Sequence, residues 1–363
     1  MKKTVSVVGA AGIPACYGGF ETLVENLTKH ASPECNYVVY CSSPLYEVQK
    51  KTYNNASLKY VNLRANGLQS IPYDIISLFK ARKSDVILIL GVSGCTILPI
   101  LKFFTKAKII TNIDGMEWKR NKWSTNVKRF LKLSEWFAVK FSDVVIADNM
   151  QITRYVKQCY GVEAKTIAYG GDHVLCVETT NYNDTPSTDE YYLSLCRIEP
   201  ENNIDMILEA FSGSNKRLKF IGNWEASEYG KNLLSKYSSF SNIEMIKPVY
   251  ELDELFKLRS NCRAYIHGHS AGGTNPSLVE IMHFAKPVFA FDCTFNRYTT
   301  DERAFYFANS VQLLGLLSDA ESGVLDDEKC AVNMKLIADE LYCWDKIAMK
   351  YEDVYFARDS QER

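Results

Sequence analysis

The sequence predicts an α/β protein built from two doubly wound domains, each with a parallel sheet between layers of helices. The chain has 363 residues, which is too long for one ordinary core and fits two domains of roughly 150 to 200 residues. Short apolar runs alternate with helical patterns along both halves of the chain. Hydrophobic residues make up 47% and charged residues 23%, a globular composition that excludes disorder, collagen and coiled coil.

The predicted strands of the N-terminal half are mostly apolar throughout instead of alternating with polar residues. This pattern is typical of a parallel sheet that is covered on both faces. The strands are expected at residues 4–9, 36–41, 58–63, 85–90, 107–113, 143–148 and 163–168. Helices are expected between them, where apolar residues repeat at helical spacing around 20–27, 75–79 and 127–139, and Ser124 is the expected N-cap of the last of these.

One segment, residues 86–104, is almost continuously apolar and about long enough to span a membrane. Four residues interrupt it in the middle: Gly91, Ser93, Gly94 and Pro99. This interruption favours a short buried strand, a tight turn and a helix. We therefore expect a protein that is soluble or held at a membrane surface.

The α/β pattern restarts after a polar stretch between Leu175 and Glu190, which we interpret as a linker or a long exposed loop. Strands are expected at 191–196, 218–221, 243–246, 263–267 and 287–291. Helices are expected at 203–212, 226–237, 253–259 and 276–284, followed by one helical stretch from 326 to about 356. We predict a first domain over 1–175, a second over 176–343, and a C-terminal helix, 344–363, that packs back on the first.

The net charge of −1 hides an asymmetry between the halves of the chain. Residues 1–170 carry 23 Lys and Arg against 12 Asp and Glu, a net +11, whereas residues 171–363 carry 19 against 31, a net −12. A basic first domain suggests an anionic partner such as a membrane lipid, a nucleic acid or a phosphate. A sequence pI of about 6.5 and the absence of a recognised nucleic-acid module disfavour a nucleic acid.

The first candidate site is the glycine-rich segment 9–21, which directly follows the first predicted strand. Small residues at a helix start let backbone amides approach a phosphate, and the helix dipole favours the negative charge. A tight turn and a dinucleotide site are the alternatives. The glycines fall at positions 9, 12, 18 and 19, so the G-x-G-x-x-G pattern of a dinucleotide site is absent. We favour a phosphate or sugar role, with Gly18 and Gly19 as candidate ligand contacts.

The second candidate is the segment 112–123, where Asp114 and Glu117 stand with two tryptophans and three cations at the end of a predicted strand. A solvated loop would not explain two tryptophans, which suit sugar stacking or a lipid interface. Residues 116–140 hold seven cations and two anions among aromatic side chains, as in a helix on a membrane surface. An ordinary amphipathic core helix fits equally well. The candidate surface contacts are Trp118, Lys119, Arg120, Lys122, Trp123, Lys128, Arg129 and Lys132.

The third candidate is Arg197, which ends the first predicted strand of the second domain. An arginine at this place can clamp a diphosphate through forked, charge-assisted hydrogen bonds. It can equally form a salt bridge with Glu199 or Glu201, and both alternatives stay open.

The strongest candidate is the segment 266–282, where a strand runs into a glycine loop and then a helix. Thr274 or Asn275 can cap that helix, whose first position suits Pro276. The amides of a helix start suit a diphosphate, and Glu280, about one turn further in, can accept hydrogen bonds from ribose hydroxyls. The joint order of these features predicts a nucleotide-diphosphate site.

The sequence gives no reason to expect a metal site. The eleven cysteines are scattered without C-x-x-C or Cys/His spacing, which predicts reduced thiols in a cytosolic protein. His267 and His269 stand two positions apart at a strand end, so their side chains are expected to point to opposite faces.

In these motifs the whole chain resembles the retaining family 4 glycosyltransferases of GT-B fold, which have two Rossmann-like domains facing across a cleft. Residues 1 to about 175 resemble the N-terminal domain of bacterial rhamnosyltransferases that build capsules and other surface polysaccharides. The matching runs are residues 12–22, 114–123, 197–203, 272–280 and 295–297. Gly272 stands where most members have a glutamate, and Asn202 where a lysine is often found. Both departures resemble the rhamnosyltransferase-like branch.

The resemblance implies transfer of a sugar from a nucleotide-diphosphate donor to a lipid-linked saccharide, with retained anomeric configuration, and favours L-rhamnose from dTDP-rhamnose. The implied donor contacts are Gly18, Gly19, Arg197, Asn202, Gly273, Thr274, Asn275, Ser277 and Glu280. Arg197 is also an implied catalytic residue, together with Asp114 and Glu117, which would orient the acceptor. No metal or other cofactor is implied. The acceptor would carry a polyprenyl diphosphate, and the protein would lie in the cytoplasm at the anionic inner face of the cell membrane.

Three alternatives remain. A glucosyl- or galactosyltransferase would use a UDP-sugar with the same phosphate contacts. A nucleotide-sugar epimerase or phosphorylase of the same fold would consume the donor alone or with free phosphate. A non-enzymatic membrane scaffold would bind lipid and no nucleotide.

Overall fold

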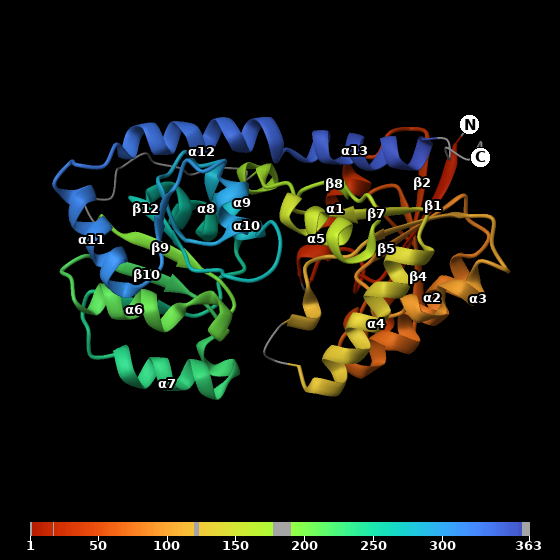
Figure 1. Cartoon of the computed structure of the whole chain (residues 1–363), viewed down its shortest axis with the longest axis horizontal. Helices are drawn as coiled ribbons and strands as arrows, with labels where there is room; N and C mark the ends of the chain where they lie inside the picture. Colours follow the sequence, from red (N-terminus) through yellow and green to blue (C-terminus); the bar gives the residue numbers. More distant parts are fainter. Residues whose placement is uncertain (1, 17, 120–122, 177–189, 358–363) are drawn as a thin grey trace. The chain divides into compact units, whose positions relative to one another are not determined.

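The chain divides into two compact units, and the computed structural model describes residues 2–16, 18–119, 123–176 and 190–357. Unit 1 comprises Met1–Tyr169 and Trp344–Arg363, and unit 2 comprises Gly170–Cys343 (Figure 1). Each unit has its own sheet, in which all described strand pairs but one run parallel. The predicted α/β class with two parallel-sheet domains is confirmed. The predicted linker around 179–187 lies outside the described residues.

The described part of unit 1 contains an eight-stranded sheet in the order β3-β4-β2-β1-β5-β6-β7-β8. Its strands are β1 (Lys3–Val8), β2 (Cys35–Ser42), β3 (Thr52–Tyr53), β4 (Ala56–Val61), β5 (Val86–Leu90), β6 (Lys108–Asn112), β7 (Val144–Ala147) and β8 (Lys165–Thr166). Only the short β3–β4 pair is antiparallel among them. All five residues of β5 are buried, because helices cover both faces of the sheet.

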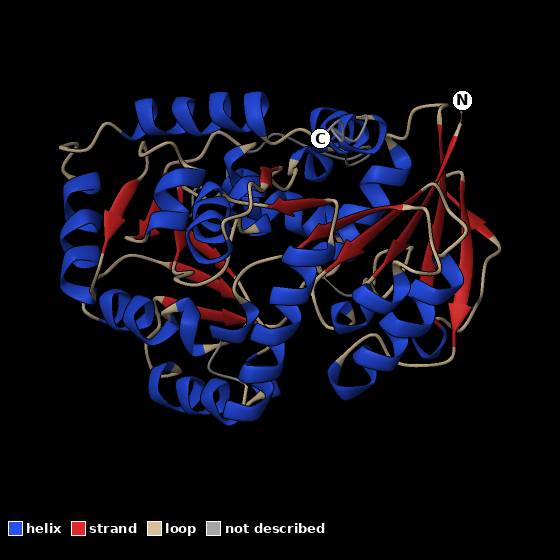
Figure 2. Ribbon diagram, turned by 45° about the vertical axis from the view of Figure 1, so that its right-hand side comes forward, coloured by secondary structure: helices blue, strands red, loops and turns tan. Residues whose placement is uncertain are grey.

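The helices of unit 1 lie on both faces of its sheet (Figure 2). They are α1 (Gly19–Lys29), α2 (Ser70–Ala81), α3 (Leu98–Leu101), α4 (Thr125–Phe141), α5 (Met150–Tyr160) and α13 (Trp344–Phe356). Although α13 comes from the end of the chain, it contributes to this core. The Tyr355 ring packs edge-on against Tyr37 with centroids 6.2 Å apart, and Glu352 accepts a hydrogen bond of 2.8 Å from the Ser32 amide.

The described part of unit 2 contains a six-stranded parallel sheet in the order β11-β10-β9-β12-β13-β14. The strands are β9 (Tyr192–Leu195), β10 (Leu218–Ile221), β11 (Ile243–Ile246), β12 (Ala264–His267), β13 (Val288–Phe291) and β14 (Phe305–Phe307). The helices are α6 (Ile204–Ser212), α7 (Glu228–Tyr237), α8 (Leu252–Asn261), α9 (Pro276–Met282), α10 (Thr294–Thr299), α11 (Ser310–Glu321) and α12 (Asp327–Leu341). Aromatic rings fill the core, where Tyr192 lies 5.5 Å from Phe211 and 6.0 Å from Phe289 between centroids.

Two differences from the predicted elements have clear causes. The sequence does not predict β3 or β14, because two or three residues are too few to show a periodic pattern. The stretch 326–356 forms two helices instead of one, and buried Tyr342 lies at the break. Its hydroxyl donates to the Thr299 carbonyl at 2.9 Å, and its own carbonyl accepts from the Gly171 amide at 2.7 Å.

The apolar segment 86–104 folds as the sequence predicts, into β5, a turn and the short helix α3. Within the described ranges, no helix combines the length and the hydropathy that crossing a bilayer requires. At the end of the segment, Phe103 and Phe104 are exposed.

Candidate functional site

In both units the strand order reverses beside the first strand, between β1 and β5 in unit 1 and between β9 and β12 in unit 2. Doubly wound sheets bind ligands outside the carboxyl ends of the strands at this reversal. The segment 9–21 follows β1, Arg197 follows β9, and the loop 268–275 follows β12 and leads into α9. Each sheet therefore brings its predicted motifs to the end where ligands bind.

The side chain of Asn202 connects the loop that follows β9 with the loop that follows β12. It is 3% exposed, and its amide nitrogen donates to the Arg197 carbonyl at 2.6 Å. Its oxygen lies 2.5 Å from Nδ1 of His269, so that nitrogen carries the histidine's proton. A Cβ on Gly268 would lie 2.1 Å from the Asn202 carbonyl oxygen, so the loops approach too closely for a larger residue. Asn202 therefore fixes the backbone of Arg197, and its predicted contact with the donor stays a prediction.

Asn275 caps α9 and satisfies the amides of the first turn. Its Oδ1 accepts from the Ser277 amide at 3.0 Å and from the Ser277 hydroxyl at 2.8 Å. Its carbonyl accepts from the amides of Leu278 and Val279, and Pro276 has no amide hydrogen. The amides of Ser277, Leu278 and Val279 in the described first turn of α9 are therefore engaged by Asn275, and the predicted donor contact of Ser277 stays a prediction. Residues 273–275 form the end of the loop that leads from β12 into the helix.

Glu280 is held in a buried ion pair. Its Oε2 pairs with the guanidinium of Arg259 in the last turn of α8, and its Oε1 lies 3.5 Å from Nε2 of His173. Burial raises the pKa of Glu280, and the Arg259 charge opposes that rise. A carboxylate fixed by one arginine keeps lone pairs for further donors, so this group suits the two vicinal hydroxyls of a ribose.

The guanidinium of Arg197 is exposed to solvent in the loop that follows β9. Its side chain is 58% exposed, and its Nε lies 3.9 Å from Oε2 of Glu199. The salt bridge that the sequence left open thus forms at the limit of ion-pair distance. Such an exposed pair contributes little to stability, so Arg197 can turn to a diphosphate at small cost.

The glycine-rich segment of unit 1 folds back against the start of α1. A Cβ on Gly9, where φ is +98°, would lie 2.0 Å from the Leu90 carbonyl oxygen, so only glycine fits. The 5% exposed Glu21 accepts a hydrogen bond of 2.6 Å from the Ala11 amide, and its other oxygen would lie 3.2 Å from a Cβ on Gly18. A carboxylate beside Gly18 and Gly19 repels a phosphate and favours a sugar hydroxyl.

Asp114 and Glu117 both follow β6, next to the reversal of the unit 1 sheet. Asp114 has a left-handed backbone with φ of +58°, and its amide donates to Oδ1 of Asn112 at 3.0 Å. Glu117 accepts a hydrogen bond of 3.0 Å from the indole of Trp123. These contacts orient the loop but engage Glu117 and Trp123 with each other, so neither is an isolated surface group.

The buried carboxylate of Glu135 contacts Trp118, one of the two tryptophans that the sequence suggested for a membrane surface. Glu135 of α4 is 1% exposed and accepts hydrogen bonds from the Trp118 indole at 3.1 Å and the Tyr155 hydroxyl at 2.5 Å, and also from the Tyr160 hydroxyl. The Lys132 ammonium lies 3.2 Å from Glu135 and 4.5 Å from the centre of the Trp118 ring. Trp118 and Lys132 are therefore half-buried and engaged by Glu135, and their predicted role as membrane contacts stays a prediction.

The other predicted surface contacts differ in their exposure. Lys119 and Arg129 are exposed, and Lys128 is half-buried. Arg120 and Lys122 lie outside the described residues.

Two family models match the chain. Residues 178–310 match "Glycosyl transferases group 1", and residues 2–172 match "Domain of unknown function (DUF1972)". The chain is a glycosyltransferase whose residues 178–310 match the group 1 family. Its N-terminal part matches DUF1972, and its C-terminal part matches the glycosyltransferase model. No protein of curated function matches its sequence.

Solved structures share the fold of this glycosyltransferase at low sequence identity. A sucrose-phosphate synthase from Thermosynechococcus elongatus has a TM-score of 0.77 at 13% identity, and 98% of each chain is covered. HepE from Anabaena, in complex with UDP-glucose, has a TM-score of 0.72 at 13% identity over 98% of this chain and 99% of that one. The trehalose-6-phosphate synthase OtsA has a TM-score of 0.72 at 10% identity over 98% and 99%. The glycosyltransferase therefore has the GT-B fold.

Among the described residues of the glycosyltransferase, one group of side chains has metal-ligand spacing: the ligand atoms of Asp172, His283 and Cys343 lie within 4.8 Å of one another. His283 Nε2 lies 3.1 Å from the Tyr342 carbonyl oxygen, and the Cys343 thiol donates to the Asp339 carbonyl at 3.3 Å. His283 Nε2 and the Cys343 thiol thus contact backbone carbonyls, and three ligands are fewer than the four of a closed structural metal site.

Arg259 and Glu135 are the polar residues that sequence reasoning missed. Arg259 meets a partner 21 positions away in the chain, and Glu135 meets one 17 positions away. Both lie in ordinary amphipathic helices, where a charged residue is expected on the solvent face. The sequence contains a weak indication that Glu21 has a structural role. It lies in the first turn of a helix, where the helix dipole stabilises a negative charge.

Proposed function

We propose that this protein transfers L-rhamnose from dTDP-rhamnose to a lipid-linked saccharide, with retention of configuration, in the synthesis of a bacterial surface polysaccharide. The observation that carries the donor part is the arrangement in unit 2, where Arg197, the 273–275 amides and the Arg259-bound Glu280 gather at one end of the sheet. HepE, which has the same fold, has been solved with UDP and with UDP-glucose. The sugar itself is inferred from the motifs of the N-terminal domain.

In this proposal Glu280 accepts hydrogen bonds from the ribose, and Arg197 with the amides of Gly273, Thr274 and Asn275 binds the diphosphate. Negative charge grows on the leaving oxygen during transfer, and fixed dipoles and a guanidinium stabilise that charge. These groups supply the positive potential without a metal. By family resemblance, the leaving phosphate accepts the proton of the acceptor hydroxyl on the same face of the sugar.

The acceptor is assigned to unit 1. Asp114 and Glu117 would orient its hydroxyls. Gly18 and Gly19 remain proposed contacts of the donor, and the neighbouring Glu21 favours a sugar hydroxyl over a phosphate at this place. The acceptor would be a saccharide on polyprenyl diphosphate, met at the anionic inner face of the cell membrane by a peripherally bound protein.

The test is consumption of nucleotide sugars by the purified full chain. The proposal predicts slow release of dTDP from dTDP-rhamnose, faster release when a lipid-linked saccharide is added, and no turnover of an unmatched donor. Faster use of UDP-glucose or UDP-galactose would identify the alternative hexosyltransferase. Equal turnover without any acceptor, or turnover driven by free phosphate, would instead identify an epimerase or phosphorylase.

A further inference from the structure

Three side chains of unit 2 that can bind a metal lie close together, outside the loops assigned to the donor. Asp172, His283 and Cys343 each offer one ligand atom, and these atoms all lie within 4.8 Å of one another. Asp172 belongs to the first residues of unit 2, His283 is the C-cap of α9, and Cys343 is the last residue of unit 2. Positions far apart in the sequence therefore meet at one place in the fold.

The backbone holds these three segments together. The Gly171 amide donates to the Tyr342 carbonyl at 2.7 Å, and the same carbonyl oxygen lies 3.1 Å from Nε2 of His283. A Cβ on Gly171 would lie 2.8 Å from the backbone of α9, so this segment runs directly against the helix. Asp172 and Cys343 are the next residues after Gly171 and Tyr342. Their places beside His283 are therefore set by main-chain contacts.

His283 has the surroundings of a metal ligand. Its side chain is fully buried, and its Nδ1 forms no hydrogen bond among the described residues. Nδ1 lies 3.4 Å from Oδ1 of Asp339, but an ion pair there needs a protonated ring, and burial lowers the pKa of His283. The Asp339 carboxylate also accepts from the Lys335 ammonium, at 2.7 Å for Oδ2. A neutral imidazole with one nitrogen at a backbone carbonyl is the usual form of a metal-bound histidine.

The three ligand types together favour zinc. Thiolate and imidazole are the ligands that zinc prefers, whereas magnesium and calcium are bound by oxygen ligands. The ligand atoms of a tetrahedral zinc ion lie about 3.3 to 3.8 Å apart, so these atoms would have to approach by up to about 1 Å. Asp172 and Cys343 are both partly exposed. Rotation of their side chains can supply that approach while buried His283 stays in place.

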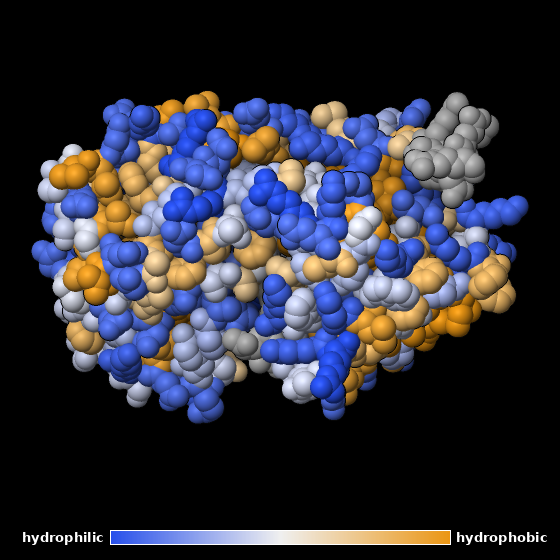
Figure 3. All heavy atoms as spheres, viewed as in Figure 1, coloured by the Kyte–Doolittle hydropathy of each residue, from blue (hydrophilic) through white to orange (hydrophobic). Residues whose placement is uncertain are grey.

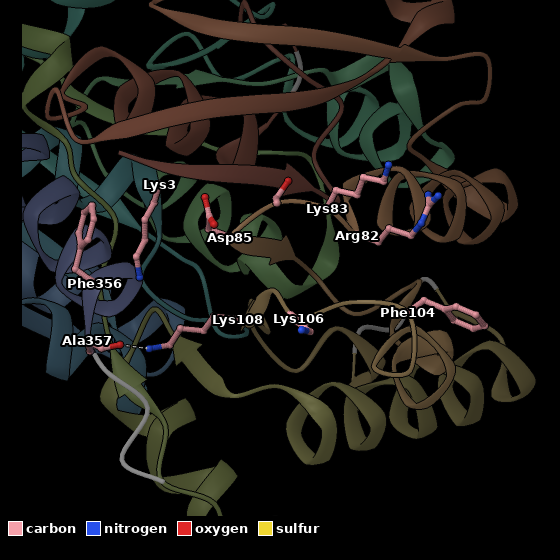
Figure 4. Close-up of a pocket in the computed structure, with 10 residues that line it drawn as sticks. Lys3, Arg82, Lys83, Asp85, Phe104, Lys106, Lys108, Phe356 and Ala357 are labelled. Atoms are coloured by element: carbon pink, nitrogen blue, oxygen red, sulfur yellow. Dashed lines mark hydrogen bonds between the residues drawn. The ribbon is translucent and has the colours of Figure 1, made fainter. Parts of the chain in front are cut away.

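Two surface features of unit 1 offer no comparable set of ligands. Hydrophobic surface gathers over α2, α3 and α4, near exposed Phe103 and Phe104 (Figure 3). A pocket of about 650 Å³ is lined mainly by lysine and arginine side chains, beside the carboxylate of Asp85 (Figure 4). Positive side chains repel a metal ion. The candidate metal ligands in the described part of the chain therefore belong to unit 2.

We propose that Asp172, His283 and Cys343 bind one zinc ion, with a water molecule as its fourth ligand. Three protein ligands and a water are the arrangement of an open zinc site. On binding, the Cys343 thiol gives its proton to solvent and ligates as a thiolate. The ion would join the first and last segments of unit 2 to the end of α9 and stabilise this unit. It takes no part in the proposed transfer of a sugar.

The test is titration of the untagged full chain with Co²⁺ and Zn²⁺, after treatment with a chelator. Cobalt in a tetrahedral site gives visible bands, and a thiolate ligand adds a near-ultraviolet charge-transfer band. We expect one cobalt ion per chain, displaced by zinc, and loss of the charge-transfer band in Cys343→Ser. Asp172→Asn should weaken zinc binding at least about tenfold, a loss that removal of a mere orienting residue already causes. The matched control, Cys159→Ser with His30→Gln, changes an exposed cysteine and an exposed histidine of unit 1 and should leave the cobalt spectrum unchanged.

Thermal denaturation gives a second readout. Zinc at 100 times its dissociation constant should raise the denaturation temperature of the wild type by about 5 °C. His283→Gln should abolish this shift, and Cys343→Ser, with its partly exposed side chain, gives the same readout if the buried substitution prevents folding. No cobalt binding, a charge-transfer band that persists in Cys343→Ser, or equal stabilisation of that variant by zinc would overturn the proposal. Neither measurement uses a nucleotide, so each outcome is independent of the proposed function.

Discussion

Glu280 and Arg259 form a buried ion pair that ties α9 to the end of α8 in unit 2. Their side chains are 13% and 7% exposed. Because the guanidinium fixes one carboxylate oxygen, the other stays oriented toward further donors, and His173 lies 3.5 Å from it. This pair holds the Glu280 carboxylate in a defined place in the candidate donor site.

Removing the arginine should both destabilise unit 2 and disturb the site. Arg259→Met leaves Glu280 buried without its cation, and breaking a buried pair in this way costs about 3 to 5 kcal/mol. Thermal denaturation of the wild type and the variant measures the loss. The matched double variant Arg259→Met with Glu280→Leu should recover most of the stability, since no charge is then left uncompensated, yet should not bind thymidine. Recovery of nucleoside binding in the double variant would remove Glu280 from the site.

Arg197→Ala should weaken binding of dTDP by about tenfold, or about 1.5 kcal/mol, through loss of a charge-assisted hydrogen bond to phosphate. Stability should stay unchanged, because the side chain is mostly exposed. Calorimetry with dTDP and with thymidine gives the comparison, and only the diphosphate should be affected. Lys247→Ala, with a side chain 82% exposed in the same unit, is the control. A dissociation constant for dTDP equal to that of the wild type would refute the diphosphate contact.

Asn202 should act through Arg197 and not by touching the ligand. Asn202→Ala leaves the Arg197 carbonyl and the His269 ring nitrogen without their partner, at a cost of about 1 to 3 kcal/mol in stability. Asn202→Asp keeps an acceptor for His269 but cannot donate to Arg197. Both variants should therefore lose affinity for dTDP while binding thymidine normally. Loss of thymidine binding in Asn202→Asp would show general collapse of the loops instead of a positioning role.

Asp74 should make the stability of unit 1 depend on pH. Burial raises the pKa of this 3% exposed carboxyl from 3.8 to about 7, against the lowering effect of hydrogen bonds from Ser93 and the Gly94 amide. The folded state therefore binds the proton more tightly than the unfolded state does. This contribution to stability is complete below about pH 4 and is lost as the pH rises through about 7, by on the order of 4 kcal/mol.

Asp74→Asn removes that proton equilibrium. Denaturant unfolding of both proteins between pH 4 and pH 8 should show the wild type losing stability relative to the variant as the pH rises. A difference that stays constant over this range would mean that Asp74 does not titrate there.

The sequence predicted the strands and the helix caps because these depend on local patterns. Continuous apolar runs mark the buried strands, and Pro276 after a capping residue marks the start of α9. The order of motifs along the chain then placed Arg197 and Glu280 at the carboxyl ends of strands.

What the sequence did not predict depends on contacts between distant positions. The Ser277 amide looks available in the sequence and is satisfied by Asn275 in the fold. Trp118 looks like a membrane residue in the sequence, and in the fold its indole donates a hydrogen bond to Glu135, one residue among many on α4. Lysines 3, 83 and 106 meet in one pocket only because parallel strands start at the same edge of a sheet.

The most direct measurement of the central claim is a crystal structure of the full chain with dTDP. The account predicts the diphosphate against Arg197 and the amides of residues 273–275, with the ribose hydroxyls on Glu280. A nucleotide bound away from the carboxyl ends of β9 and β12, or no bound nucleotide at saturating concentration, would contradict it.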